Sequence, residues 1–305
     1  MAVFLLKRVF HGLGVLWVVA TLTFLLLHMT PGGPFDRERR LPPEVIANIE
    51  AKYHLDEPLP SQYLRYLKGI LGGDFGPSYK YLDRGVNQII AETLPTSALL
   101  GALALLFALL VSLPAGLIAA CYRNSWMDRA CMLIATLGIS VPHFILGALL
   151  IWAVALQLGW FPVGRWDHSR SALLPMITLG AAPAAYLSAL FRSSLVEALG
   201  EDFIRTARAK GVKEVIVFLK HALTYSLIPV LTVMGPLTAA LLTGSFVVEY
   251  VFAIPGMGRF FITAVTDRDY PLIMGITFVY TVLLVCANLV VDLLYGYVDP
   301  RIRTE

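Results

Sequence analysis

A chain of 305 residues in which 57% are hydrophobic and only 15% are charged is too apolar for an ordinary soluble domain. The formal net charge of +3 is small and dispersed, and no stripe of Arg and Lys alternates with aromatics, which excludes a nucleic-acid-binding protein. Composition therefore predicts an all-α polytopic protein embedded in a lipid bilayer. Cys121, Cys131 and Cys286 lack metal-ligand spacing, so we interpret them as small, buried apolar side chains.

The N-terminal segment predicts a membrane anchor. Lys7 and Arg8 precede an apolar run over residues 9–29, which has the length of about 20 residues that spans a bilayer. The run is longer than the apolar core of a signal peptide, and no A-x-A cleavage site follows it. Residues 1–30 are therefore expected to form a retained transmembrane helix with its N-terminus inside.

Residues 31–93 form a polar interval that differs from the rest of the chain. Two short helical patterns, at 43–55 and 61–71, flank a turn at 56–58, and a glycine-rich, constrained loop follows at 72–78. The interval is too charged to enter lipid and too regular for a flexible linker. We expect a folded extracellular cap, which either has a functional role on the outer face or only packs over the helices.

Five further apolar segments predict membrane spans, and together with the first they give six crossings. They cover residues 94–121, 130–158, 173–195, 227–252 and 272–297, and leave a cytoplasmic tail at 298–305. Six crossings place both termini on one side. Arg and Lys are more frequent in the short segments on that side than in the short loops opposite, which predicts that both termini are cytoplasmic.

Few ionisable residues fall within the spans. Glu249 lies near the outer end of the fifth span and Asp292 lies in the sixth. A carboxylate in lipid costs about 2 to 4 kcal/mol, so each should face protein or water. Both are candidates for lining or gating a translocation path, and the alternative is a paired structural carboxylate. His28 and His143 are interpreted as packed or hydrogen-bonded side chains.

The polar stretch at 197–221 interrupts the apolar second half of the chain. Phe203, Ile204 and Ala207 share one helix side, whereas Arg205, Arg208 and Lys210 share the other. Gly211 can end this helix, and an apolar pattern at 212, 215, 216 and 219 predicts a second helix. The stretch is either two short helices with a glycine corner and a basic cytoplasmic face, or a solvated, positively charged loop.

The run from Arg205 to Gly211 resembles the cytoplasmic coupling motif of ABC importer permeases, in the form used by peptide permeases. Ala207 and Gly211 match that motif, whereas Arg205 and Thr206 replace its Glu and first Ala. Three further segments resemble sequences of the peptide and nickel branch of these permeases. They are GDFGPS at 73–78, the Glu-x-x-Phe-x-x-Pro-Gly-x-Gly run at 249–258 and Asp-Pro-Arg at 299–301. Along nearly its whole length the chain resembles the first, B-type permease subunit of oligopeptide importers.

The resemblance implies a type I ABC importer fold of six transmembrane helices, with a core at 94–297 and a folded insertion between the first two helices. It implies a bacterial inner-membrane subunit that translocates oligopeptides by alternating access. The implied partners are a second homologous permease, two ABC ATPase subunits and an extracytoplasmic peptide-binding protein. The same branch also serves dipeptides, glutathione and nickel chelates. The implied ATPase-coupling residues are Phe203, Arg205, Thr206, Ala207, Arg208, Ala209, Lys210, Gly211 and His221.

Motifs for catalysis and nucleotide binding do not occur in the sequence. Without G-x-x-x-x-G-K-[ST], H-E-x-x-H, G-x-S-x-G or a Cys/His cluster, the chain is expected to be no enzyme and to bind no cofactor or metal itself. ATP and Mg are then bound by the partner subunits. Two other classes stay open: an intramembrane enzyme that uses Glu249, Asp292 or His143, and an ion-driven carrier, which should show an internal repeat that we do not find.

Overall fold

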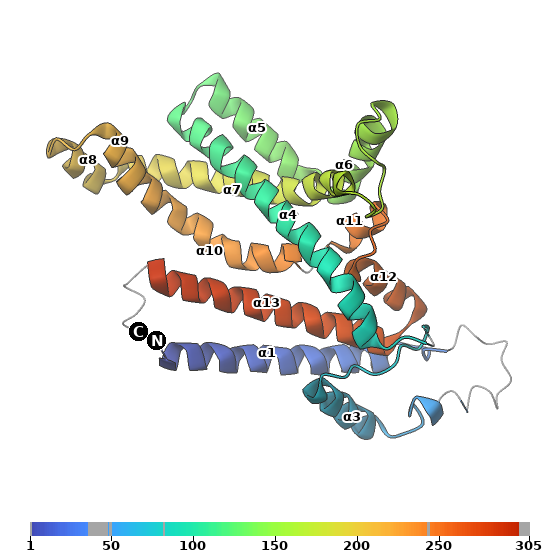
Figure 1. Ribbon diagram of the computed structural model, residues 1–305. Coiled ribbons are helices and arrows are strands. Elements are labelled where there is room, and N and C mark those ends of the chain that lie inside the picture. The colour runs from blue at the N-terminus through green and yellow to red at the C-terminus, as the bar shows by residue number, and fades with distance from the viewer. Residues whose placement is uncertain (1, 36–47, 49–50, 82, 243–244, 299–305) are drawn as a thin grey trace. The chain divides into compact units, whose positions relative to one another are not determined.

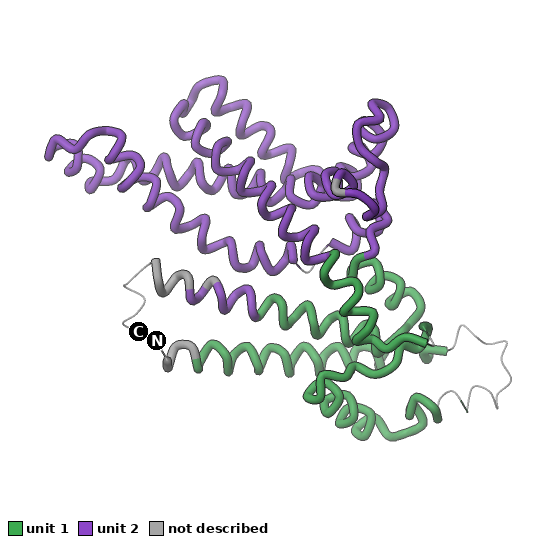
Figure 2. The backbone as a smooth tube through the Cα atoms, in the orientation of Figure 1, with its two compact units in different colours: residues 1–96, 256–285 green, residues 97–255, 286–305 purple. Residues whose placement is uncertain are grey.

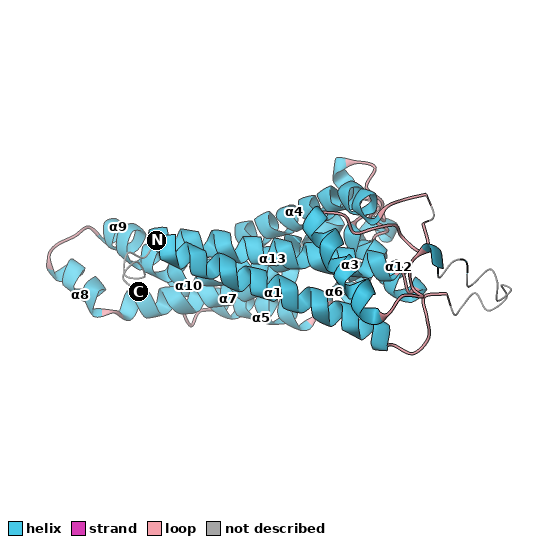
Figure 3. Cartoon of the chain, turned by 90° about the horizontal axis from the view of Figure 1, so that it is seen from below, coloured by secondary structure: helices cyan, strands magenta, loops and turns pink. Residues whose placement is uncertain are grey.

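The computed structural model describes residues 2–35, 48, 51–81, 83–242 and 245–298, and every regular element within those ranges is a helix (Figures 1 and 3). One isolated β-bridge pairs Pro77 with Gly85. The elements are α1 (Ala2–Met29), α3 (Leu59–Gly72), α4 (Val86–Cys121), α5 (Trp126–Ser140), α6 (His143–Leu150), the π-helix η2 (Ile151–Gln157), the 3-10 helix η3 (Ser169–Ala172), α7 (Leu173–Gly200), α8 (Asp202–Ala209), α9 (Glu214–Ile216), the π-helix η4 (Val217–Ala222), α10 (Leu223–Leu242), α11 (Phe246–Val251), α12 (Met257–Asp267) and α13 (Tyr270–Val298).

Five helical stretches are long and apolar enough to cross a membrane, which confirms the predicted all-α, multi-pass architecture. A sixth crossing results if the bent pair Trp126–Ser140 and His143–Gln157 acts as one span. The five stretches are Leu6–Met29, Val86–Cys121, Arg170–Gly200, Glu214–Val251 and Tyr270–Val290.

The span predicted at residues 130–158 is broken into two helical parts. The chain bends by 106° between α5 and α6. Val141 is extended, with φ −82° and ψ 119°, and Pro142 precedes the first residue of α6. Proline disfavours helical geometry in the residue before it and has no N–H to donate, so the apolar run breaks at this dipeptide. Hydropathy alone cannot detect such a break, because both halves are apolar.

The chain divides into two compact units, which Figure 2 shows in different colours. Unit 1 comprises residues 1–96 and 256–285, and unit 2 comprises residues 97–255 and 286–305. The helices α4 and α13 each contribute residues to both units. The boundaries predicted for the cap at 31–93 and the tail at 298–305 stay predictions, and residues 299–305 lie outside the described ranges.

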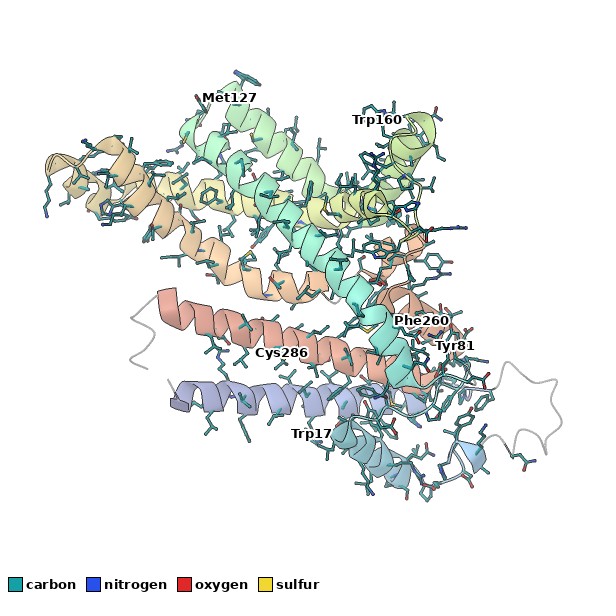
Figure 4. All side chains as sticks on the ribbon, viewed as in Figure 1. Trp17, Tyr81, Met127, Trp160, Phe260 and Cys286 are labelled. Atoms are coloured by element: carbon teal, nitrogen blue, oxygen red, sulfur yellow. The ribbon has the colours of Figure 1, made fainter. Side chains whose placement is uncertain are left out.

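In unit 1, a buried carboxylate holds the loop after α3 against the start of α13. Asp269 is fully buried and accepts hydrogen bonds from the Ser78 hydroxyl and, at 3.1 Å, from the Tyr79 N–H. Nearby, the rings of Tyr81 and Phe260 lie together, with centroids 5.6 Å apart (Figure 4). These contacts order the loop, which is the polar part of the unit that the sequence predicts to be constrained.

The elements predicted for the polar interval are only partly within the described ranges. The helix expected at 61–71 is confirmed as α3, which ends at Gly73 with φ 69°. Gly76 also has a positive φ of 81°, as the constrained loop requires. Most of the helix expected at 43–55 lies outside the described residues.

Unit 2 is built around α7, whose buried face includes Phe191 and Leu195. Glycines allow neighbouring helices to approach this core closely. A Cβ on Gly180 would lie 2.7 Å from the Ala104 carbonyl oxygen of α4, and a Cβ on Gly138 would lie 2.9 Å from the Ala185 Cβ. Close backbone approach at small residues is typical of membrane helix packing. This close packing holds α4 and α5 against α7, the helix that leads into the polar stretch at 197–221.

The expectation that all three cysteines are buried is wrong. All three thiols are free, but Cys121 and Cys286 are exposed and Cys131 is half-buried. Figure 4 labels Cys286 on α13. A free thiol behaves as a small apolar group, and helix faces that meet lipid are as apolar as a core. Apolar context therefore does not distinguish these two environments.

Candidate functional site

The polar stretch at 197–221 contains the predicted first short helix and the glycine corner, but the second predicted helix is the start of the long helical stretch Glu214–Val251. The first helix, α8, follows α7 after the extended residue Glu201, with φ −71° and ψ 152°. Gly211 has φ 78°, a left-handed conformation that L-residues with side chains rarely adopt. The chain then turns into α9 and continues through η4 into α10. The α8–α9 element, residues 202–216, thus projects from one end of α7 and α10 (Figure 1).

The apolar side of α8 anchors the element to the core of unit 2. Ile204 has no exposed surface and belongs to the same buried cluster as Phe191, Leu195, Val217 and Ala222. Ala207 is half-buried beside it. These contacts lie on α7 and η4, so α8 packs against the elements on both sides of it in the chain.

The opposite side of α8 is polar and exposed. Arg205, Thr206, Arg208 and Lys210 are all exposed, and so are Ala209, Gly211 and the ring of Phe203, which lies 5.4 Å from the ring of Tyr225. The structure therefore confirms that the basic side chains predicted to share one side of this helix are exposed. His221, also among the predicted coupling residues, is half-buried in η4 and outside this surface.

A bidentate ion pair braces the glycine corner. Arg208 donates from Nη2 to Glu214 Oε1 at 2.5 Å and from Nε to Oε2 at 3.1 Å. The hydrogen bond with the Glu214 carboxylate raises the pKa of Arg208 above its usual range. In contrast, Arg205 lies 3.5 Å from Asp202, and both side chains of this pair are largely exposed. Arg208 is thus engaged within the element, whereas Arg205 and Lys210 present their charges outward.

The apolar stripe predicted after Gly211 is wrong in its register. Val215, Ile216 and Leu219 are exposed, and the residues buried in their place are Val217 and Ala222. Val212, the first residue of the stripe, is half-buried, and from Val217 onwards the chain forms the π-helix η4. Each turn of a π-helix is wider than an α-helical turn, so the spacing of i, i+3, i+4 and i+7 no longer marks a single face.

Glu249 lies in α11, at the other end of α10 from the α8–α9 element (Figure 1). Its side chain has no exposed surface, and Ser97 Oγ donates to Glu249 Oε1 at 2.8 Å. Ser97, on α4, is also fully buried. The contact fits a paired structural carboxylate, and the path or gate role stays a prediction.

The remaining singled-out residues lie on other helices. Asp292 is half-buried near the C-terminal end of α13. His143 Nδ1 lies 3.1 Å from the Thr178 carbonyl oxygen, and His28 contacts the Phe24 carbonyl oxygen at 2.8 Å, which confirms that both rings are hydrogen-bonded. Within the described residues no group of three or more His, Cys, Asp or Glu side chains could hold a metal ion.

Sequence reasoning missed the ion pair between Asp128 and Arg192. Arg192 Nε lies 2.5 Å from Asp128 Oδ1, and Arg192 Nη2 lies 2.6 Å from Asp128 Oδ2. The side chain of Asp128 is 5% exposed and that of Arg192 is 24% exposed. A charged residue inside the apolar run of α7 was a signal for this pair, but 64 residues separate the partners in the sequence.

Taken together, these features define a multi-pass membrane protein with an anchored, basic surface element and no assembled catalytic or metal centre in its described part. Comparison with known proteins agrees with that class. The model of the binding-protein-dependent transport system inner membrane component family matches residues 112–304, and the corresponding N-terminal model matches residues 1–101. The chain belongs to this family. It is therefore a transport subunit and not an enzyme.

Two relatives are similar along the whole chain. The dipeptide transport system permease protein DppB of Bacillus subtilis is 46% identical over 303 residues, covering 99% of this chain and 98% of the relative. The oligopeptide transport system permease protein OppB of Haemophilus influenzae is 43% identical over 302 residues, which cover 98% of this chain and 99% of the relative.

Solved structures give the same fold. An inward-facing MetNI methionine ABC transporter aligns with a TM-score of 0.55 at 18% identity, covering 69% of this chain and 96% of that chain. An amino acid ABC transporter crystallised with histidines aligns with a TM-score of 0.56 at 17% identity, and the alignment covers 68% of this chain and 94% of that chain. The fold is thus that of type I ABC importer membrane subunits.

Proposed function

We propose that this chain is a permease subunit that moves oligopeptides across the bacterial inner membrane by alternating access, and that the α8–α9 element couples this movement to ATP hydrolysis. The observation that carries the proposal is the construction of α8. Its buried side chain Ile204 fixes it to the ends of α7 and η4, while Arg205 and Lys210 project outward from an exposed surface. A partner that pushes on this surface moves two long helices at once.

The energy comes from partner subunits. The sequence has no phosphate-binding loop, so ATP and Mg bind to two ABC ATPase subunits and not to this chain. ATPase dimers offer two docking grooves, whereas this chain has one coupling element, so a second, homologous permease completes the assembly. An extracytoplasmic peptide-binding protein delivers the substrate on the opposite side. The basic surface of α8 favours a groove with acidic residues.

Both termini lie in the cytoplasm in this arrangement. The excess of Arg and Lys on the side of the α8–α9 element supports that orientation. Residues 31–93 then lie on the periplasmic or extracellular side. Glu249 and Asp292 are candidates for positions along the substrate path, and the Ser97 hydroxyl donates a hydrogen bond to Glu249.

The substrate class rests on the relatives, whose names specify oligopeptides in one case and dipeptides in the other. Oligopeptides are the first candidates, and dipeptides, glutathione and nickel chelates are the alternatives within the same branch. Competition measurements with unlabelled compounds of each kind, against uptake of one labelled peptide, decide between them.

The test begins with the tagged chain, purified in mild detergent from its native host, and the proteins that accompany it. We expect a second permease and ATPases with phosphate-binding loops. After reconstitution of that complex, the double variant Arg205→Glu and Lys210→Glu should lose most ATP-driven peptide uptake and retain less of the ATPase subunits. Arg170→Glu is the matched control, because Arg170 is an exposed cation on η3 at the other end of α7. Unchanged uptake and retention in the double variant would contradict the coupling role.

A further inference from the structure

The helix α3 in unit 1 has three distinct stripes along its 14 residues. Residues 59, 63, 66 and 70 form one apolar stripe, and residues 60, 64, 67 and 71 form a second one beside it. The third stripe, at 61, 65, 68 and 72, is polar and carries Arg65 and Lys68. An amphipathic helix that only covers a protein core needs one apolar stripe, so the second one calls for an additional apolar environment.

The first stripe packs on α1 through specific contacts. Tyr63 Oη lies 2.7 Å from Thr21 Oγ1, and the ring of Phe24 lies 5.3 Å from that of Tyr63 and 5.9 Å from that of Tyr66. Next to this stripe, Gln62 Oε1 lies 3.2 Å from His28 Nε2. These contacts fix α3 alongside the last turns of α1.

The depth of α3 in the membrane follows from these contacts. Thr21, Phe24 and His28 belong to the membrane-spanning stretch Leu6–Met29. At a rise of 1.5 Å per residue, Thr21 lies about 12 Å below Met29 along the helix axis. Trp17, one turn further in, points outward from α1 (Figure 4). The part of α3 that makes these contacts therefore lies beside the candidate membrane-spanning stretch of α1.

Two leucines of the second stripe of α3 are exposed, whereas Leu67 between them is half-buried. Leu64 is 65% exposed and Leu71 is 88% exposed. The spanning stretch of α1 also carries exposed apolar side chains, and Leu22 and Leu26 are 52% and 65% exposed. Tyrosines beside the exposed leucines and a flanking Lys68 are the side chains that favour the boundary between lipid chains and headgroups.

A groove of about 320 Å³ runs between α1 and α3. Its lining is mostly apolar and includes Leu25, Met29, Leu59, Pro60 and Tyr63. An acyl chain fits such a groove better than a polar ligand does, because its walls offer few hydrogen-bonding groups. The groove, the exposed stripe and the depth of α3 thus favour the same occupant.

We propose that α3 is an interfacial membrane helix. It lies in the leaflet at the Met29 end of α1, with Leu64 and Leu71 against phospholipid acyl chains and with Ser61, Arg65 and Lys68 towards the headgroups and water. Phospholipid fills the groove between α1 and α3. The bilayer thereby holds one end of the polar interval at a defined depth. The proposal does not depend on the substrate or on the coupling mechanism.

Site-directed spin labelling of the full chain, with its co-purified partners, in phospholipid vesicles tests the proposal. Cys121, Cys131 and Cys286 are first replaced by alanine, and single labels are then placed in Leu64→Cys and Leu71→Cys. Leu22→Cys on α1 is the lipid-exposed reference, and Ser61→Cys on the polar stripe of α3 is the matched control. Relaxation of each label by oxygen, which concentrates in lipid, is compared with relaxation by a water-soluble nickel chelate.

The labels at 64 and 71 should show strong relaxation by oxygen and a loss of relaxation by the nickel chelate relative to the label at 61, as at 22. Nickel relaxation at 64 and 71 equal to that at 61 would place α3 in water and overturn the proposal. Weak relaxation by both reagents would overturn it too, because a protein partner would then cover the stripe. Leu71 is almost fully exposed, so the label there gives a result even where Leu64→Cys perturbs packing.

Discussion

Arg192 of α7 donates two hydrogen bonds, at 2.5 and 2.6 Å, to the carboxylate of Asp128 in the first turn of α5. The same carboxylate accepts the N–H of Asn124 at 2.9 Å, and Ser125 caps the start of the helix. Arg192 lies about two turns before Gly200, where α7 gives way to α8. The ion pair therefore fixes the end of α7 that carries the α8–α9 element.

Asp128→Asn should lower the stability of unit 2. The variant leaves Arg192 half-buried without its counter-charge, which costs about 1 to 3 kcal/mol once partial exposure reduces the effect of a fully buried pair. The measurement is the apparent midpoint of thermal unfolding in detergent. Asp202→Asn is the control, because the exposed Asp202–Arg205 pair contributes little. Equal midpoints for the two variants would show that the buried pair does not stabilise the unit.

Gly211→Ala should impair coupling. The positive φ of 78° at Gly211 strains any residue with a Cβ by about 1 to 2 kcal/mol, although no atom lies within 4 Å of the added methyl group. The strain distorts the corner that Arg208 and Glu214 brace, so ATP-driven uptake should fall while the protein still folds.

Gly200→Ala is the matched control for Gly211→Ala. Gly200 ends α7 with ordinary helical geometry and also has open space around its Cβ position. Uptake and expression of Gly200→Ala should equal those of the unmodified chain. A loss of uptake in both variants, measured in the same vesicles, would mean that steric bulk and not backbone geometry is responsible.

Local sequence patterns were sufficient where one stretch determines its own structure. The charges at the start of α8, the apolar side that contains Ile204 and the break at Gly211 all follow from short-range rules, and the structure confirms the short helix α8 and the break after it. The long apolar runs likewise predicted the membrane-spanning helices of the described chain. Hydropathy is a strong signal because only helices satisfy their backbone hydrogen bonds in lipid in this way.

Features that depend on register or on distant partners were not predictable. In the π-helix η4 the buried residues are Val217 and Ala222, which are five positions apart. This spacing was not predicted, because no short sequence motif identifies a π-helix. The partners of Arg192 and Glu249 lie far away in the sequence, so the position of each charge within an apolar run is unusual but does not reveal its neighbour. The helical pattern at 61–71 likewise does not show which of the apolar side chains of α3 are buried.

Ile204→Ala should detach α8 from its anchor. The buried position loses three carbon atoms from a cluster that includes Phe191, Leu195 and Val217, at a cost of about 2 to 5 kcal/mol in local stability. Protection of the α8 amides from hydrogen exchange should fall, and ATP-driven uptake should fall with it. Val215→Ala is the control, since Val215 is 67% exposed and a change there is expected to stay within about 0.5 kcal/mol. Unchanged amide protection in Ile204→Ala would contradict the anchoring role.

Glu249→Ala and Glu249→Gln should separate a structural role of this carboxylate from a role in the substrate path. Ser97 Oγ donates to Glu249 at 2.8 Å, and the carbonyl oxygen of a glutamine accepts the same hydrogen bond. Alanine removes the acceptor from a fully buried site, which costs about 1 to 3 kcal/mol, so the thermal midpoint should fall for Glu249→Ala and much less for Glu249→Gln. Uptake that follows the midpoint in both variants assigns Glu249 to packing between α11 and α4. Loss of uptake in Glu249→Gln at an unchanged midpoint would instead assign its charge to the path or gate.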